Sequence, residues 1–143
     1  MEVTRAIPTQ ELTAMIAQTL SEAVADLSQQ IDDLRGLRAG DVPEPVLTKL
    51  VDEVRKVVVF LKYTGQYLRQ TYADPRSREE ILRIKLHLLS VLRALSDQVR
   101  LGDKIAAYDL ITEELRDNLT QWKISVIPLL RATAASATGS IPV

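Results

Sequence analysis

The apolar residues of this chain recur at steps of three and four between its glycine and proline positions, and this spacing most constrains the fold. In one segment the row continues for about seven turns through Leu47, Val51, Val54, Val58, Leu61, Gly65, Leu68 and Tyr72. Such steps keep residues on one face of an α-helix. Valine-rich composition alone would favour a strand, but the polar residues here fall where a helix exposes them. The spacing therefore predicts a helix.

Three other segments show the same steps. The first carries Leu20, Val24, Leu27, Ile31 and Leu34, and the last carries Tyr108, Ile111, Leu115, Leu119, Trp122, Val126 and Leu129. Apolar residues of the third cover an arc of about 220°, which predicts contacts with neighbours on two sides. Together the segments predict an all-α, antiparallel, up-down-up-down four-helix bundle with helices at about 9–35, 45–73, 76–101 and 103–131. A dimer exchanging long hairpins would show the same pattern.

The glycine, proline and capping residues between these segments predict a single bundle domain over residues 9–131. Pro75 is suited to the first turn of a helix, Gly102 to the end of one, and Asp103 to the N-cap of the next. Pro128 is expected to kink or end the last helix, because it lacks an amide donor and clashes with the preceding turn. Residues 1–8 are expected to form an N-terminal arm and residues 132–143 a flexible tail.

Charge and composition limit the kinds of molecule that this chain is expected to bind. The 18 lysines and arginines nearly balance 19 aspartates and glutamates, so net charge does not favour nucleic acid. Residues 57–61 are the longest apolar run and are too short for stable membrane insertion. With no cysteine the chain fits a reducing compartment, and we expect a cytoplasmic protein.

His87 is the only histidine, and it provides the alternative function. Histidine phosphotransfer domains are four-helix bundles with an exposed histidine, so a signalling bundle using His87 is one hypothesis. Metal sites in bundles use glutamate three residues before histidine, whereas Ile84 stands there. Phosphate loops, nucleophile elbows and zinc motifs are also absent from the sequence. We therefore expect no enzyme, no metal, no cofactor and no small-molecule substrate.

The second predicted helix carries a further apolar face. Each residue of an α-helix is rotated by 100° from the one before it, so the core row lies on one side of this helix. Four large side chains are predicted to point away from that side: Val59, Phe60, Tyr63 and Tyr67. Aromatic residues with polar tips are enriched in binding hot spots, so this face is the predicted interface for a protein partner or, by twofold symmetry, a homodimer. Two alternatives remain: other parts of the chain cover the face, or it binds a membrane surface with Lys56 and Lys62 nearby.

Overall fold

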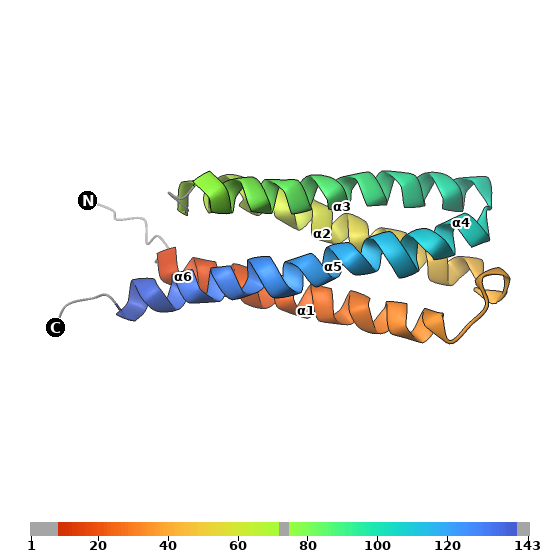
Figure 1. Ribbon diagram of the computed structural model, residues 1–143, viewed down its shortest axis with the longest axis horizontal. Helices are drawn as coiled ribbons and strands as arrows, with labels where there is room; N and C mark the ends of the chain where they lie inside the picture. The colour runs from red at the N-terminus through yellow and green to blue at the C-terminus, as the bar shows by residue number, and fades with distance from the viewer. Residues whose placement is uncertain (1–8, 72–74, 140–143) are drawn as a thin grey trace, which may run out of the picture.

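The computed structural model describes residues 9–71 and 75–139, and these form the predicted four-helix bundle (Figure 1). The first three long helices are α1 (Thr9–Arg35), α2 (Glu44–Thr71) and α3 (Pro75–Leu101). A short 3₁₀ turn, Ala39–Asp41, joins α1 to α2. The fourth long helix is continuous through α4 (Lys104–Asp109), Leu110–Leu115, α5 (Arg116–Gln121), Trp122–Val126 and α6 (Ile127–Gly139).

Consecutive helices pack side by side, and α6 packs along α1 to close the bundle. Figure 1 shows that the start of α1 and the end of α6 lie at the same end of the bundle, together with the end of α2 and the start of α3. The predicted arm, residues 1–8, and Tyr72 lie outside the described residues. The up-down-up-down order agrees with the prediction from turn and cap residues.

The core is one apolar cluster drawn from every long helix. On α1 all five residues of the predicted row are buried, and on α2 the buried set is Leu47, Leu50, Val51, Val54, Val57 and Leu61. Trp122 is the largest fully buried side chain. The predicted double contact of α3 is confirmed, since it packs against α2 on one side and against α4 and α5 on the other. Leu82 and Leu86, at the margin of its wide apolar arc, nevertheless stay exposed.

Two stretches of the fourth helix are wound as π-helix, Leu110–Leu115 and Trp122–Val126. The buried positions from Ala107 to Ala134 make seven turns over 27 residues, whereas a regular α-helix makes seven turns in about 25 residues. A π-turn accommodates one extra residue, so the two stretches account for the difference. Pro128 follows the second of them, where the Ile127 amide donates to the Trp122 carbonyl.

Pro128 therefore does not end the helix, which continues into the segment expected to form the tail from residue 132. α6 continues to Gly139, and Ala134 is buried. The segment after Arg131 is rich in alanine, which has the highest helix propensity, and α6 packs against α1. Residues 140–143 lie outside the described part of the chain.

The predicted boundary between the third and fourth helices is confirmed. Gly102 has a φ of +76°, the left-handed conformation that ends many helices. The Asp103 carboxylate accepts a hydrogen bond from the Ala106 amide at 3.1 Å. This N-cap starts the fourth helix antiparallel to α3.

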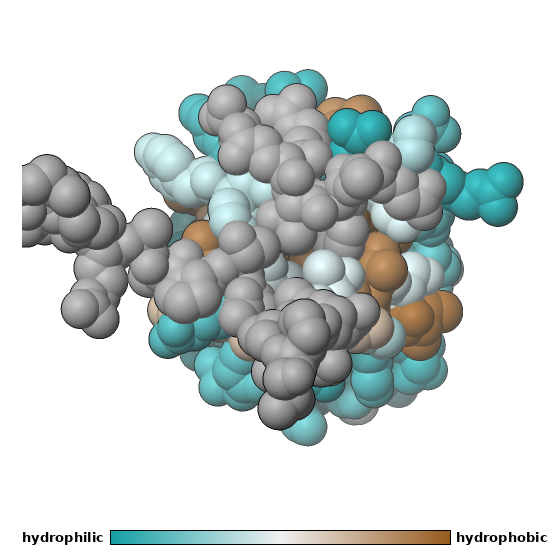
Figure 2. Space-filling model, turned by 90° about the vertical axis from the view of Figure 1, so that its left-hand side faces the viewer, coloured by the Kyte–Doolittle hydropathy of each residue, from teal (hydrophilic) through white to brown (hydrophobic). Residues whose placement is uncertain are grey.

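Apolar atoms also reach the surface at the end of the bundle that holds both termini. Figure 2 shows hydrophobic and hydrophilic residues side by side around the rim of this end. In the described ranges, 9–71 and 75–139, no helix combines the length and apolar character needed to span a bilayer.

Candidate functional site: the α1–α2 face

The four predicted interface residues of α2 divide into two pairs. Tyr63 is 77 % exposed and Val59 is 45 % exposed, whereas Phe60 and Tyr67 are half-buried and pack against the core. The prediction that all four point away from the core is therefore wrong for Phe60 and Tyr67. They stand 100° or more from the core row but still pack against the buried cluster, and Tyr67 also contacts Thr13 of α1.

Tyr67 fixes how α1 and α2 lie against each other at this end. Its hydroxyl lies 3.2 Å from the Thr13 hydroxyl, and Thr13 is one of two buried polar residues described. Because the two helices are antiparallel, this contact places residues 13 and 67 at the same level of the bundle. The side chain of Tyr67 therefore joins the two helices and keeps one edge at the surface.

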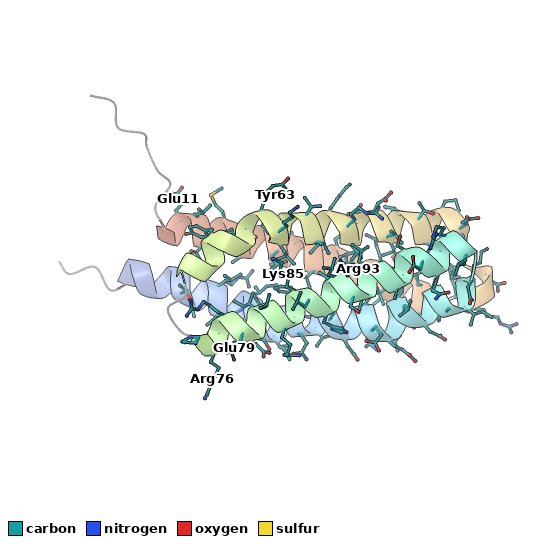
Figure 3. The ribbon with its side chains drawn as sticks, turned by 90° about the horizontal axis from the view of Figure 1, so that it is seen from above. Glu11, Tyr63, Arg76, Glu79, Lys85 and Arg93 are labelled. Atoms are coloured by element: carbon teal, nitrogen blue, oxygen red, sulfur yellow. The ribbon has the colours of Figure 1, made fainter. Side chains whose placement is uncertain are left out.

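α1 contributes an exposed apolar residue to the same side. Met15 is 50 % exposed, and Leu12 is half-buried against the core. Figure 3 shows Tyr63 and Glu11 projecting from the same side of the bundle, one from α2 and one from α1. Met15 was not predicted as part of this surface, although Leu12, Met15 and Thr19 follow one another at steps of three and four on α1.

Two neighbouring rows of side chains, one on α1 and one on α2, form a surface that we call the α1–α2 face. The α1 row contains Leu12, Met15, Thr19, Glu22, Asp26 and Asp33, and the α2 row contains Lys49, Glu53, Lys56, Phe60, Tyr63 and Tyr67. Each row follows steps of three, four or seven, so its members share one side of their helix. Val59 borders the α2 row on the side of α3.

His87 lies on the opposite side of the bundle in a network that connects α3 with the fourth helix. Its Nε2 is 3.1 Å from Oε2 of Glu114, and its Nδ1 is 3.0 Å from Nδ2 of Asn118. The Trp122 indole N–H donates to Oδ1 of Asn118 at 2.8 Å, and Nδ2 of Asn118 donates to the Ile84 carbonyl at 3.0 Å. Asn118 is buried, and its side chain forms hydrogen bonds with three partners.

This network fixes the roles of its members. The indole can only donate, so the oxygen of Asn118 faces Trp122 and its amide nitrogen faces His87. His87 then accepts at Nδ1 and, as a neutral ring, donates from Nε2 to Glu114. Both ring nitrogens are engaged, and a carboxylate would repel an incoming phosphoryl group. The geometry does not favour the phosphotransfer hypothesis.

The remaining polar clusters are ordinary helix surface. Arg83 donates to Glu80 at 2.7 Å, and this hydrogen bond lowers the pKa of the Glu80 carboxyl and raises that of Arg83. A shallow depression at the start of α2 is lined only by exposed residues: Glu44, Pro45, Thr48, Lys49 and Asp52. Within the described part of the chain, no three histidine or acidic side chains come together as a metal site.

Comparison with known proteins found no matching family model, no matching curated protein and no matching solved structure.

Proposed function

We propose that this chain is a non-enzymatic helical protein–protein interaction module of the adaptor, scaffold or chaperone-like kind, and that it self-associates as a homodimer through the α1–α2 face. The observation that carries the proposal is the 77 % exposure of Tyr63, flanked by Met15 at 50 % and Val59 at 45 %. Large exposed side chains gathered on one face are characteristic of interaction surfaces. The cytoplasm, where a chain without cysteine fits, is the proposed location.

Binding would work by burial of these side chains, without a chemical step. Removing apolar surface from water contributes about 25 cal/mol per Å², and a tyrosine adds a hydroxyl that bonds at the rim of an interface. Phe60 and Tyr67 are held against the core, so little side-chain freedom remains for them to lose on binding. Such a pre-ordered surface binds more tightly than a mobile one of equal area.

The test is the mass in solution, measured by light scattering over a range of concentrations. The wild-type chain should be dimeric, and Tyr63→Glu should raise the dimer dissociation constant by about 30-fold or more, as expected for a central aromatic residue. Thermal stability of the monomer should change little, because Tyr63 contributes mainly exposed surface. Tyr67→Glu is unsuitable as a test, since Tyr67 packs on the core and contacts Thr13.

Ile124→Glu is the matched control. Ile124 is 62 % exposed and lies on the fourth helix, away from the α1–α2 face, so this variant should keep the wild-type dissociation constant. A monomeric wild-type chain, or equal loss of association in both variants, would contradict self-association through this face.

A further inference from the structure

The α1–α2 face is divided along its length into an apolar half and a charged half. Because α1 and α2 are antiparallel, Leu12 and Met15 of the α1 row lie beside Phe60, Tyr63 and Tyr67 of the α2 row. Toward the 3₁₀ turn, Glu22, Asp26 and Asp33 lie beside Lys56 and Lys49. In the apolar half both helices offer large side chains, whereas in the charged half α1 carries three acids and α2 carries two lysines and one glutamate, Glu53.

The charges of this half are not neutralised by ion pairs in the described residues. The three acids of the α1 row accept hydrogen bonds from neutral glutamines of their own helix: Glu22 from Gln18, Asp26 from Gln30 and Asp33 from Gln29. The ion pairs found elsewhere in residues 9–71 and 75–139 do not include Lys49 or Lys56. The three acids of α1 and the two lysines of α2 are therefore available to a second molecule.

Two kinds of twofold axis can join two copies of a face made from two helices. An axis across the helices makes the copies antiparallel and lays α1 on α1. With full overlap the charged half of one copy then covers the apolar half of the other, and the apolar halves meet only if the copies are shifted so that the charged halves stay uncovered. An axis along the helices makes the copies parallel and lays α1 of one on α2 of the other. Only the second arrangement brings apolar half to apolar half and at the same time places the α1 acids beside the α2 lysines.

We propose that the partner of this face is a second copy of the chain in parallel orientation, with α1 of each protomer on α2 of the other. The inference rests on the proposed self-association and adds its geometry. Residues 13 and 67 share a level, so Asp26 of one copy lies near the level of Lys56 of the other, and Asp33 near that of Lys49. Tyr63 of each copy lies near the level of Met15 and Thr19 of the other.

The orientation can be measured with one spin label per protomer. The chain contains no cysteine, so Gly40→Cys provides a single attachment site in the turn between α1 and α2. A Cβ at Gly40 meets nothing within 4 Å. In the parallel dimer the two labels lie at the same end, with an expected separation of about 30 Å or less, the width of a few packed helices. A separation of about 40 Å or more, one helix length, would overturn the parallel arrangement.

Charge reversal tests the contact between the rows. Asp26→Lys alone and Lys56→Glu alone should each raise the dimer dissociation constant by about tenfold or more, because each replaces two attractions per dimer by two repulsions. The double variant Asp26→Lys/Lys56→Glu should return close to the wild-type value. Asp109→Lys, at an exposed site on α4, changes net charge equally and should leave the constant unchanged.

The outcomes separate this inference from the function on which it rests. If Tyr63→Glu dissociates the dimer but the labels lie far apart, or charge reversal has no effect, self-association stands and the parallel arrangement is wrong. A wild-type chain that stays monomeric overturns both.

Discussion

Asn118 shows how one buried amide can connect two helices of this bundle. Its oxygen accepts from Trp122 and its nitrogen donates to the Ile84 carbonyl, so the fourth helix and α3 are joined inside the core. Because positions 118 and 122 are four residues apart, both side chains lie on one side of their helix. The sequence predicted Trp122 as core, but it carried no signal that Asn118 would be buried, since asparagine is usually exposed.

We expect Asn118→Leu to lower the free energy of unfolding by about 1–3 kcal/mol, the cost of leaving a buried donor without an acceptor. The affected donor is the indole N–H of Trp122, which is fully buried. Urea unfolding followed by tryptophan fluorescence measures the change. Thr120→Leu, at an exposed position of the same helix, should cost much less, and equal losses would show that the amide contributes nothing.

At the scale of single elements, α2 illustrates what helical periodicity can and cannot predict. The three-and-four spacing of apolar residues predicted this helix correctly, although its valine-rich composition alone would favour a strand. Leu47, Val51, Val54 and Leu61 are buried as predicted. Gly65 belongs to the core row, where a residue without a side chain can allow close approach of a neighbouring helix. Instead, a Cβ added at this position would lie 2.9 Å from Nζ of Lys85, the nearest atom, and Figure 3 shows Lys85 between α2 and α3. Periodicity gives the side of the helix that faces inward, but not which neighbouring atom occupies the space.

Gly65→Ala should therefore stabilise the protein by about 0.5–1 kcal/mol, because alanine favours the helix over glycine by this amount. The Lys85 ammonium, at the end of a flexible side chain, can move aside. A rise in the thermal midpoint, measured by circular dichroism, would confirm this. A lower midpoint would mean that α2 and α3 pack too tightly at Gly65 for a methyl group.

The end of the fourth helix allows a similar comparison. Removal of residues 132–143 should lower the free energy of unfolding by about 1–2 kcal/mol, because Ala134 is buried and α6 packs along α1. A chain ending at residue 139 retains the whole of α6 and serves as the control. If both truncated chains unfold at the same denaturant concentration, the last turns of α6 do not contribute to stability.

For the whole molecule, the sequence predicted the number, order and direction of the helices, because apolar spacing and cap residues such as Gly102 and Asp103 are local signals. It located the exposed face only partly. Exposure depends on where neighbouring helices lie, so Phe60 and Tyr67 could not be distinguished from Tyr63 by angle alone. Met15 lies on α1, about 50 residues from the aromatic cluster, and only the packing of the two helices brings it to the same face.

The two π-turns give the fourth helix a further property. Each is equivalent to a one-residue insertion that the helix absorbs within a single turn, so the segments before and after it remain aligned with the core. Loss of one residue from Leu110–Leu115 or Trp122–Val126 would convert that stretch to ordinary α-helix and preserve this alignment. The same loss from the middle of α3 would rotate one half by about 100° relative to the other and turn its leucines outward. The fourth helix is thus the part of this bundle where changes in chain length are most easily accommodated.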